Sequence, residues 1–239
     1  MTVDFCVPAY NEDEIFPASS LRIWQFLQAL NLPYEWRLVF IVNGSTQAFK
    51  ILVQNFVNQN RPQAACFIVA EAGKGRAIKT YFNQSEADIL VYMDIDLAVD
   101  LNDLPALLSP LLSSEVDLCF GSRMMPGSIK NRSWVRESSS RAYLYLSRLC
   151  LNHKFSDLQC GFKAITASAW QIIAPSIKND AWFFDTELIY FSLKHNLKIK
   201  EIPVNWSENR YSQRRSKIKV WREAWVFLQE VVNLRWRAQ

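Results

Sequence analysis

Short apolar runs that end in polar clusters recur along the first half of the chain. They predict β-strands at Thr2–Val7, Arg37–Val42, Ala64–Ala70 and Ile89–Met93. Between them, apolar residues recur at helical spacing in a segment that begins at Asp13 or Glu14, and in the segments Gln47–Gln59 and Ala77–Asn83. This alternation predicts an α/β fold, a three-layer α/β/α arrangement around a mostly parallel, Rossmann-like central sheet.

The second half continues the alternation and then changes character. Helices are expected at Leu101–Leu112, Trp134–Asn152 and Trp182–His195, and strands at Val116–Gly121, Phe162–Thr166 and Lys198–Val204. The last stretch is rich in cations and tryptophan. We therefore expect one main domain, 1–213, followed by a basic amphipathic helix, 214–239.

The final helix carries one apolar stripe at steps of three or four residues. Its members are Ile218, Trp221, Trp225, Leu228, Val232 and Trp236. Seven cations and two glutamates lie in the same stretch. A basic helix with tryptophan on its apolar side suits an anionic membrane surface. The alternative is that the stripe packs on the protein's own core, and the two are compatible.

The bulk composition narrows the class of protein. The 239 residues are 50% hydrophobic and 21% charged, which fits one large domain with a sizeable core. A net charge of +4 is too weak to imply nucleic acid as a partner. Five scattered cysteines show no metal-site spacing, and their odd number argues against a disulfide framework. We expect no signal peptide and no bilayer span, hence a cytoplasmic protein.

Two aspartates, Asp94 and Asp96, follow the apolar run Ile89–Met93 directly. Ligands of open α/β sheets gather at the carboxyl ends of such strands. Two hard carboxylates there suit Mg²⁺ or Mn²⁺, which in turn would hold a diphosphate. The alternative is an Asp that caps the next helix, but Asp100 or Asn102 can do that.

Three further features each admit two interpretations. Lys74 lies between two glycines before a helix, where it is either an anion site or part of a solvated turn. Arg141 and Arg148 are seven residues apart on one helix face, which suits a phosphate monoester or a plain solvated surface. Asp185 lies in a first helical turn, where capping is the alternative to a role in the site.

Taken in order, the motifs resemble family 2 inverting glycosyltransferases of the GT-A fold, and more narrowly dolichyl-phosphate glucosyltransferases and dolichol-phosphate mannose synthases. The motifs are V-P-A-Y-N-E at Val7–Glu12, V-N-G-S-T at Val42–Thr46, G-K-G at Gly73–Gly75, D-I-D at Asp94–Asp96, G-S-R at Gly121–Arg123, D-L-Q-C-G-F-K at Asp157–Lys163 and F-D-T-E-L at Phe184–Leu188. The resemblance covers essentially Met1–Lys219.

The resemblance implies roles for individual residues. Donor nucleotide contacts are expected from Pro8, Ala9, Tyr10, Glu12, Asn43, Lys74, Asp94, Ile95, Arg210 and Lys217. A metal would bind Asp94 and Asp96. Catalytic roles are expected for Asp185, Arg123 and Asp96. The acceptor would contact Arg141, Arg148, Asp157, Gln159 and Lys163. Three positions depart from the family pattern, with Val42 and Asn43 in place of two aspartates and Ala98 in place of a third metal ligand.

The implied activity is metal-dependent transfer of a hexose, with inversion, from a nucleoside-diphosphate sugar to a polyprenyl or dolichyl phosphate. UDP-glucose is favoured as donor and GDP-mannose is the other candidate. Alternatives are transfer to a glycan hydroxyl, a non-catalytic sugar-nucleotide binder and a nucleotidyltransferase. The expected partners are the sugar nucleotide and the lipid, with peripheral contact to the cytoplasmic face of a membrane and no nucleic acid.

Overall fold

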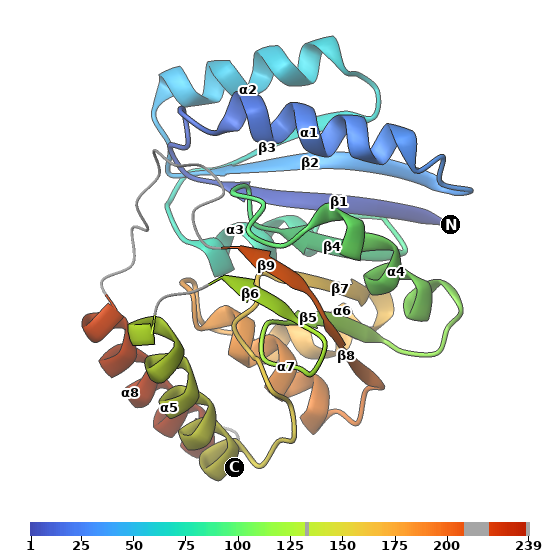
Figure 1. Ribbon diagram of the computed structural model, residues 1–239. Coiled ribbons are helices and arrows are strands. Elements are labelled where there is room, and N and C mark those ends of the chain that lie inside the picture. Colours follow the sequence, from blue (N-terminus) through green and yellow to red (C-terminus); the bar gives the residue numbers. More distant parts are fainter. Residues whose placement is uncertain (132–133, 208–219, 238–239) are drawn as a thin grey trace.

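The computed structural model describes residues 1–131, 134–207 and 220–237 (Figure 1). Its main sheet has the order β3-β2-β1-β4-β7-β5-β8. The strands are β1 (Thr2–Ala9), β2 (Glu35–Asn43), β3 (Ala64–Val69), β4 (Ile89–Met93), β5 (Leu118–Ser122), β7 (Phe162–Thr166) and β8 (Ile199–Pro203). Only β7 within this sheet runs antiparallel to its neighbours, β4 and β5. The predicted mostly parallel sheet is confirmed, and each strand boundary lies within two residues of its predicted place.

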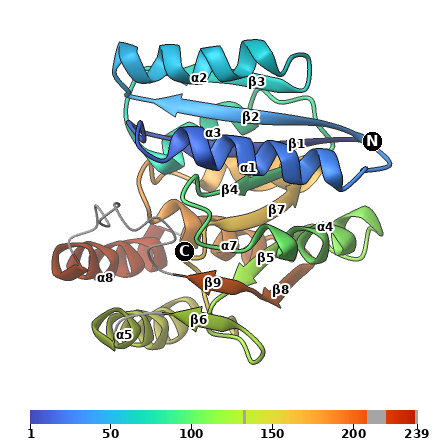
Figure 2. The ribbon, with the colours of Figure 1, turned by 45° about the horizontal axis from the view of Figure 1, so that its top comes forward.

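Both faces of the central strands are buried, which explains their continuous apolar runs. In β4, Ile89, Val91 and Met93 belong to the core on one face, and Leu90 and Tyr92 to the core on the other. The first core is covered by α1 (Phe16–Ala29), α2 (Gln47–Gln59) and α4 (Leu104–Leu112). The second is covered by α3 (Lys74–Phe82), α6 (Ala167–Ile173) and α7 (Phe184–Lys194). Figure 2 shows the sheet between these layers.

Two of the boundaries that differ from the prediction do so for physical reasons that the structure makes plain. We expected Pro8 to end the first strand, but β1 continues to Ala9. At Pro8 only β2 lies alongside, since the pairing with β4 stops at Cys6, so the missing N–H costs no ladder bond on that side. The helix expected from Ala77 begins at Lys74, directly after Gly73 at φ +149°.

Smaller elements were not predicted. Strands β6 (Ile129–Asn131) and β9 (Asn205–Ser207) form a separate parallel pair, and a 3₁₀ turn lies at Ala174–Ser176. The first turn of the predicted helix Leu101–Leu112 is a 3₁₀ turn, Leu101–Asp103. The Asp100 carboxylate accepts a hydrogen bond from the Asn102 N–H at 3.0 Å, so the expected cap at this position is confirmed. All five cysteines are free thiols.

Helices α5 (Trp134–Leu151) and α8 (Val220–Arg237) pack against each other beside the main body (Figures 1 and 2). Helix α8 turns Val231 and Leu234 into the second core, whereas Trp236 is 72% exposed. The two members of the predicted stripe whose side chains are described, Val232 and Trp236, are both exposed and do not take part in this docking. Of that stripe, Ile218 and the side chains of Trp221, Trp225 and Leu228 lie outside the described part of the chain.

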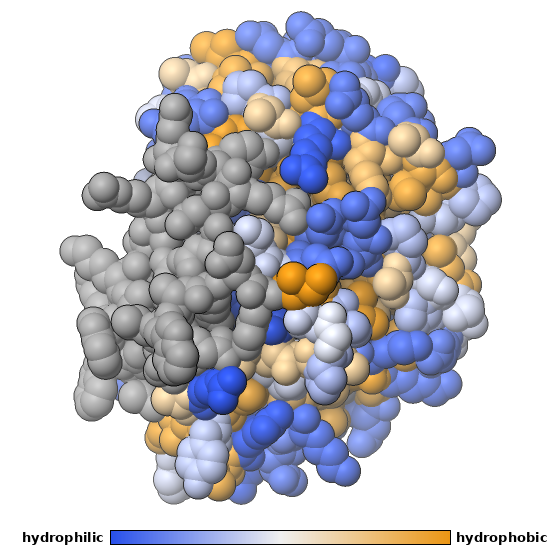
Figure 3. Space-filling model, viewed as in Figure 1, coloured by the Kyte–Doolittle hydropathy of each residue, from blue (hydrophilic) through white to orange (hydrophobic). Residues whose placement is uncertain are grey.

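No described helix is long and apolar enough to cross a bilayer. On the face shown in Figure 3, apolar and polar side chains are interspersed around the uncoloured region. The boundary between 1–213 and 214–239 falls outside the described residues and stays a prediction.

Candidate active site

Three strand ends meet at one buried amide. Asn43, at the end of β2, donates from Nδ2 to the Ala9 carbonyl at 3.0 Å and accepts the Gly73 N–H on Oδ1 at 3.0 Å. The Gly44 N–H donates to the Val69 carbonyl at the end of β3. Asn43 thus joins the loops that follow β1, β2 and β3. Backbone groups occupy both the oxygen and the nitrogen of the Asn43 amide. Its predicted contact with the nucleotide stays a prediction.

Asp94, the first residue after β4, forms an ion pair with Lys74. Lys74 Nζ lies 2.9 Å from Asp94 Oδ1, and the Asp94 side chain is 36% exposed. A Cβ on Gly161 would overlap Asp94 Oδ2 and lie 2.7 Å from Lys74 Nζ. Only glycine at this position leaves room for the pair. Burial, and then the neighbouring carboxylates of Asp96 and Asp185, raise the pKa of Asp94 although Lys74 opposes the shift.

Asp185 is 1% exposed and is surrounded by donors. Lys163 Nζ and the Tyr92 hydroxyl both donate to its Oδ1, and Lys74 Nζ lies 3.2 Å from its Oδ2. Burial alone would raise the pKa of Asp185, but the two ammonium groups outweigh it and lower the pKa below its ordinary value. The carboxylate is held ionised. Phe183, the N-cap residue of α7, makes no side-chain cap, and Asp185 lies in the first turn, where its negative charge also favours the helix dipole.

The loop before α7 fixes the start of α3, where Lys74 lies. The Asp180 carbonyl accepts the Arg76 N–H at 3.1 Å, and the Asp180 carboxylate lies 2.9 Å from Arg76 and 2.7 Å from Lys79. A Cβ on Gly75 would lie 2.5 Å from the Asn179 carbonyl oxygen. Close backbone contact therefore holds Lys74 in position. The glycines of G-K-G are needed for this packing, whether or not the loop also binds an anion.

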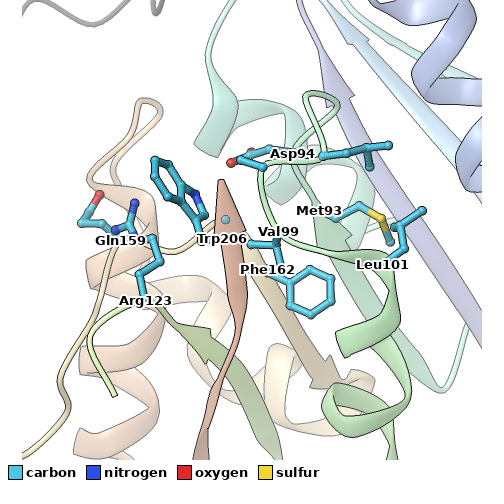
Figure 4. Close-up of a pocket in the computed structure, with 11 residues that line it drawn as sticks. Met93, Asp94, Val99, Leu101, Arg123, Gln159, Phe162 and Trp206 are labelled. Atoms are coloured by element: carbon cyan, nitrogen blue, oxygen red, sulfur yellow. The ribbon is translucent and has the colours of Figure 1, made fainter. Parts of the chain in front are cut away.

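A pocket of about 50 Å³ opens beside Asp94 (Figure 4). Arg123, Gln159 and Trp206 lie on the side opposite Asp94. Its lining comprises Met93, Asp94, Leu97, Ala98, Val99, Leu101, Arg123, Gln159, Gly161, Phe162 and Trp206. This volume holds a few waters or an ion but no sugar nucleotide. A donor would have to extend over the neighbouring loops.

Arg123 reaches the pocket while paired to Asp157. Its Nε lies 2.6 Å from Asp157 Oδ2 and its second terminal nitrogen 2.9 Å from Oδ1, a bidentate pair. Arg123 lowers the pKa of Asp157 despite the opposing effect of burial. The backbone N–H groups of Ser156 and Asp157 both donate to Glu201 Oε1 at 2.9 Å, which fixes the loop that carries Asp157. Asp157 fixes the position of Arg123, and the expected contact of Arg123 with a phosphate group stays a prediction.

Two carboxylates, of Asp94 and Asp96, follow β4, and their chemistry suits a divalent ion, although their predicted role as metal ligands stays a prediction. Asp94 faces the pocket, and Asp96 follows two residues later with its Oδ1 accepting the Ala98 N–H at 3.1 Å. Mg²⁺ is commonly held by one or two carboxylates together with substrate phosphates rather than by a cage of protein ligands alone. The described residues contain no cluster of three or more His, Cys, Asp or Glu side chains that could hold a metal ion, and Asp96 is not among the residues that line the pocket.

Some predicted site residues lie elsewhere. Arg141 and Arg148 do not line the pocket, and Arg148 donates to the Phe155 carbonyl at 3.0 Å. Lys163 is buried against Asp185 rather than presented to an acceptor. Arg210 and Lys217 lie outside the described residues. Of the remaining predicted donor contacts, Pro8 and Ala9 are buried at the end of β1, Ile95 is buried after β4, Tyr10 is exposed and Glu12 is partly exposed.

Sequence reasoning missed two site residues. Tyr92 donates to Asp185, and Trp206 closes the pocket with its ring 5.9 Å from the Arg123 guanidinium. Tyr92 could have been noticed in the sequence. Alternation along β4 places its hydroxyl on the face opposite Met93, two residues before Asp94. Trp206 could not, since its place depends on the small β6–β9 pair.

The model of the Glycosyl transferase family 2 domain matches residues 4–172, which is more than half of the chain. The chain belongs to glycosyl transferase family 2. Glycosyltransferase AglD of Haloferax volcanii is 37% identical over 217 residues, which cover 85% of this chain and 33% of AglD. The dolichyl-phosphate beta-glucosyltransferase of Dictyostelium discoideum is 26% identical over 215 residues, which cover 84% of this chain and 65% of that protein. The chain thus spans less than two thirds of these relatives.

Solved structures show the same fold. Glucosyl-3-phosphoglycerate synthase from Mycobacterium tuberculosis, in complex with Mn²⁺, UDP-glucose and phosphoglyceric acid, superposes with a TM-score of 0.68 at 17% identity. The match covers 99% of this chain and 79% of the synthase. The predicted GT-A type of the fold is confirmed for this family 2 member.

Proposed function

We propose that this family 2 protein transfers a hexose from a nucleoside-diphosphate sugar to the phosphate of a polyprenyl lipid, with inversion at the anomeric carbon. The observation that carries the proposal is the Lys74–Asp94 pair at the rim of the pocket, facing Arg123 across it. The relatives named dolichyl-phosphate beta-glucosyltransferase support a polyprenyl phosphate as acceptor and glucose as sugar. UDP-glucose is the proposed donor.

The donor diphosphate would lie beside the Lys74–Asp94 pair, on the side of Asp94 that faces the pocket. A divalent ion bound by Asp94 and Asp96 would neutralise charge that develops on the leaving diphosphate. Glucosyl-3-phosphoglycerate synthase, which has the same fold, is solved in complex with Mn²⁺ and UDP-glucose, so this fold can accommodate both. Arg123, fixed by Asp157, would hold a phosphate on the other side of the pocket.

The acceptor needs little help from a base. A phosphate monoester has a second pKa of about 6, so most of it is already a dianion at neutral pH. Asp185 is buried among cations and held ionised. We therefore assign Asp185 to the positioning of Lys74 rather than to proton removal.

We further propose that α5 and α8 bring the protein to the lipid at the cytoplasmic face of a membrane. Tyr145 and Leu149 on α5 and Trp236 on α8 are among the most exposed apolar side chains. Arg141 and Arg235, on the same two helices, are exposed cations, which suits an anionic surface.

Transfer of labelled sugar tests the activity. UDP-glucose and GDP-mannose are each offered with a short polyprenyl phosphate or with a soluble glycan, in Mn²⁺. We expect glucose on the lipid phosphate, and we expect Asp96→Ala to lose transfer by about two orders of magnitude or more. Sugar on the glycan alone would assign the protein to hydroxyl acceptors.

Sedimentation with anionic liposomes tests the membrane contact. The paired change Tyr145→Ser and Leu149→Ser, and separately Trp236→Ser, should each reduce the bound fraction. Ile51→Ser on α2 removes a half-exposed apolar side chain from another part of the molecule and should change nothing. Equal loss in all variants would contradict a specific membrane face.

A further inference from the structure

The charged side chains around Asp185 form a balanced cluster. It contains two ammonium groups, Lys74 and Lys163, and two carboxylates, Asp94 and Asp185. These four charges sum to zero, and the carboxylate of Asp96, which also acts on Asp94, adds one negative charge. A divalent ion bound at Asp94 therefore adds two positive charges beside ammonium groups that are already matched.

Lys74 occupies the cationic position next to Asp94. Its side chain is only 7% exposed and lies between Asp94 Oδ1 at 2.9 Å and Asp185 Oδ2 at 3.2 Å. The ring of Tyr92 lies 5.5 Å from Nζ and that of Trp182 lies 5.1 Å from it. Carboxylates and aromatic faces thus stabilise the ammonium group in this position.

Neither partner is free to move away. The close packing of Gly75 on the loop before α7 holds the backbone of Lys74, and Asp94 is packed against Gly161. Asp185 is fixed in turn, because Lys163 also donates to the carbonyls of Leu158 at 3.3 Å and Cys160 at 2.5 Å. The Lys74–Asp94 pair is therefore built into the site.

We propose that Lys74 is the resident cation of Asp94 and suppresses binding of a divalent ion until a nucleoside diphosphate is present. The inference rests on the proposed function, because it takes Asp94 to be a metal ligand. The diphosphate supplies the negative charge that makes a second cation favourable beside Lys74. Metal binding then depends on the donor, and Asp185 is a positioning residue that acts through Lys74.

Two substitutions should act in opposite directions on nucleotide-free Mn²⁺ binding. Lys74→Met removes a positive charge beside Asp94 and should lower the Kd for Mn²⁺ by about tenfold or more. Asp185→Asn removes a negative charge and leaves Lys74 with one partner, so it should raise that Kd. A merely structural role predicts weaker binding in both variants.

The experiment measures free Mn²⁺ by electron paramagnetic resonance during titration of the full chain, without nucleotide and then with UDP. Lys79→Met is the matched control, because Lys79 lies on the same helix and is paired to Asp180 outside the pocket. We expect this control to bind Mn²⁺ as wild type does. Circular dichroism verifies that each variant is folded.

An unchanged or higher Kd in folded Lys74→Met would overturn the inference while leaving the proposed function intact, provided that UDP still promotes Mn²⁺ binding to wild type. Failure of wild type to bind Mn²⁺ even with UDP would overturn the proposed metal site itself. If Lys74→Met does not fold, Lys74→Met combined with Asp185→Asn removes both charges of one pair. It should bind Mn²⁺ more tightly than Asp185→Asn alone, because only Lys74 differs between these two variants, and binding that is equal to or weaker than that of Asp185→Asn overturns the inference.

Discussion

Two buried aspartates lie near opposite ends of helix α3, and they differ in what surrounds them. Asp4, in β1, accepts a bidentate pair from Arg37 at 2.9 Å and hydrogen bonds from Tyr81 and Ser85. Asp185, beyond the other end, is held by Lys74, Lys163 and Tyr92. Each is 1% exposed, and each has one tyrosine hydroxyl as a donor.

The difference lies in how each network connects to the pocket. Arg37 pairs with Asp4 near the start of β1, at the end of the strands away from the pocket. This pair has no partner that lines the pocket. Lys74 serves Asp185 and also Asp94, whose carboxylate faces the pocket. A buried charge that is shared with an exposed partner can respond to a ligand, whereas one with a closed set of partners contributes to stability alone.

The largest expected effect separates the two networks. Asp185→Asn leaves two lysines around a neutral group and should cost about 3 kcal/mol of stability, with a fall in kcat of about a hundredfold. Asp4→Asn should cost about 2 kcal/mol, since the half-exposed Arg37 can turn to water, with unchanged turnover per folded molecule. Urea unfolding and lipid transfer assays measure both. Loss of turnover in Asp4→Asn would contradict the distinction.

The next effect concerns the room that Gly161 leaves. Gly161→Ala places a methyl group against Asp94 Oδ2 and Lys74 Nζ, so the pair must separate. We expect a drop in transfer of about tenfold and a loss of about 1–2 kcal/mol of stability. The drop should appear with saturating donor as well. A variant as active as wild type would show that the pair is dispensable.

Asn43→Asp tests the junction of the three loops. The new carboxylate would face the Ala9 carbonyl at 3.0 Å with no proton to donate, and the free energy of unfolding should fall by about 2 kcal/mol. Asn43→Ser serves as a neutral comparison. If Asn43→Asp is as stable as wild type, the Asn43 side chain does not hold the three loops together.

The pH dependence of stability isolates Asp185. Its pKa lies below the ordinary value of 3.8 in the folded protein, so its stabilising contribution is present above that pH and is lost as the pH falls through the folded pKa. The stability gap between wild type and Asp185→Asn should be constant from about pH 5 to 7 and shrink below the ordinary value. Urea unfolding across this range measures it. A stability difference between the two proteins that grows as the pH falls would contradict the lowered pKa of Asp185.

The smallest effect is expected at the attachment of α8. Arg237 pairs with fully buried Glu187, which also accepts the N–H groups of Lys178 at 2.8 Å and Asn179 at 2.7 Å. Because Arg237 is partly exposed and the backbone donors remain, Arg237→Met should cost about 1 kcal/mol. Thermal unfolding measures it, with Arg235→Met as control.

Much of the fold could be predicted from local pattern. The buried runs determined the strands because each face of the sheet is covered, and Asp100 capped the following turn as its spacing suggested. The place of Asp94 at the end of β4 followed from the same run. The β6–β9 pair and the docking row of α8 escaped prediction, because a three-residue strand has no periodicity and helix α8 is apolar on more than one side.

The amino-acid order by itself determined which residues end the strands, and so placed Asp94 and Asp96 at the rim of a sheet. Only the tertiary structure decided that Asp185 faces inward between Lys74 and Lys163. These residues are far apart in the chain, and they meet because β7 enters the sheet antiparallel beside β4 while α7 packs beneath them. Local propensity sets backbone conformation, but ion pairing depends on distance in space, which only packing establishes.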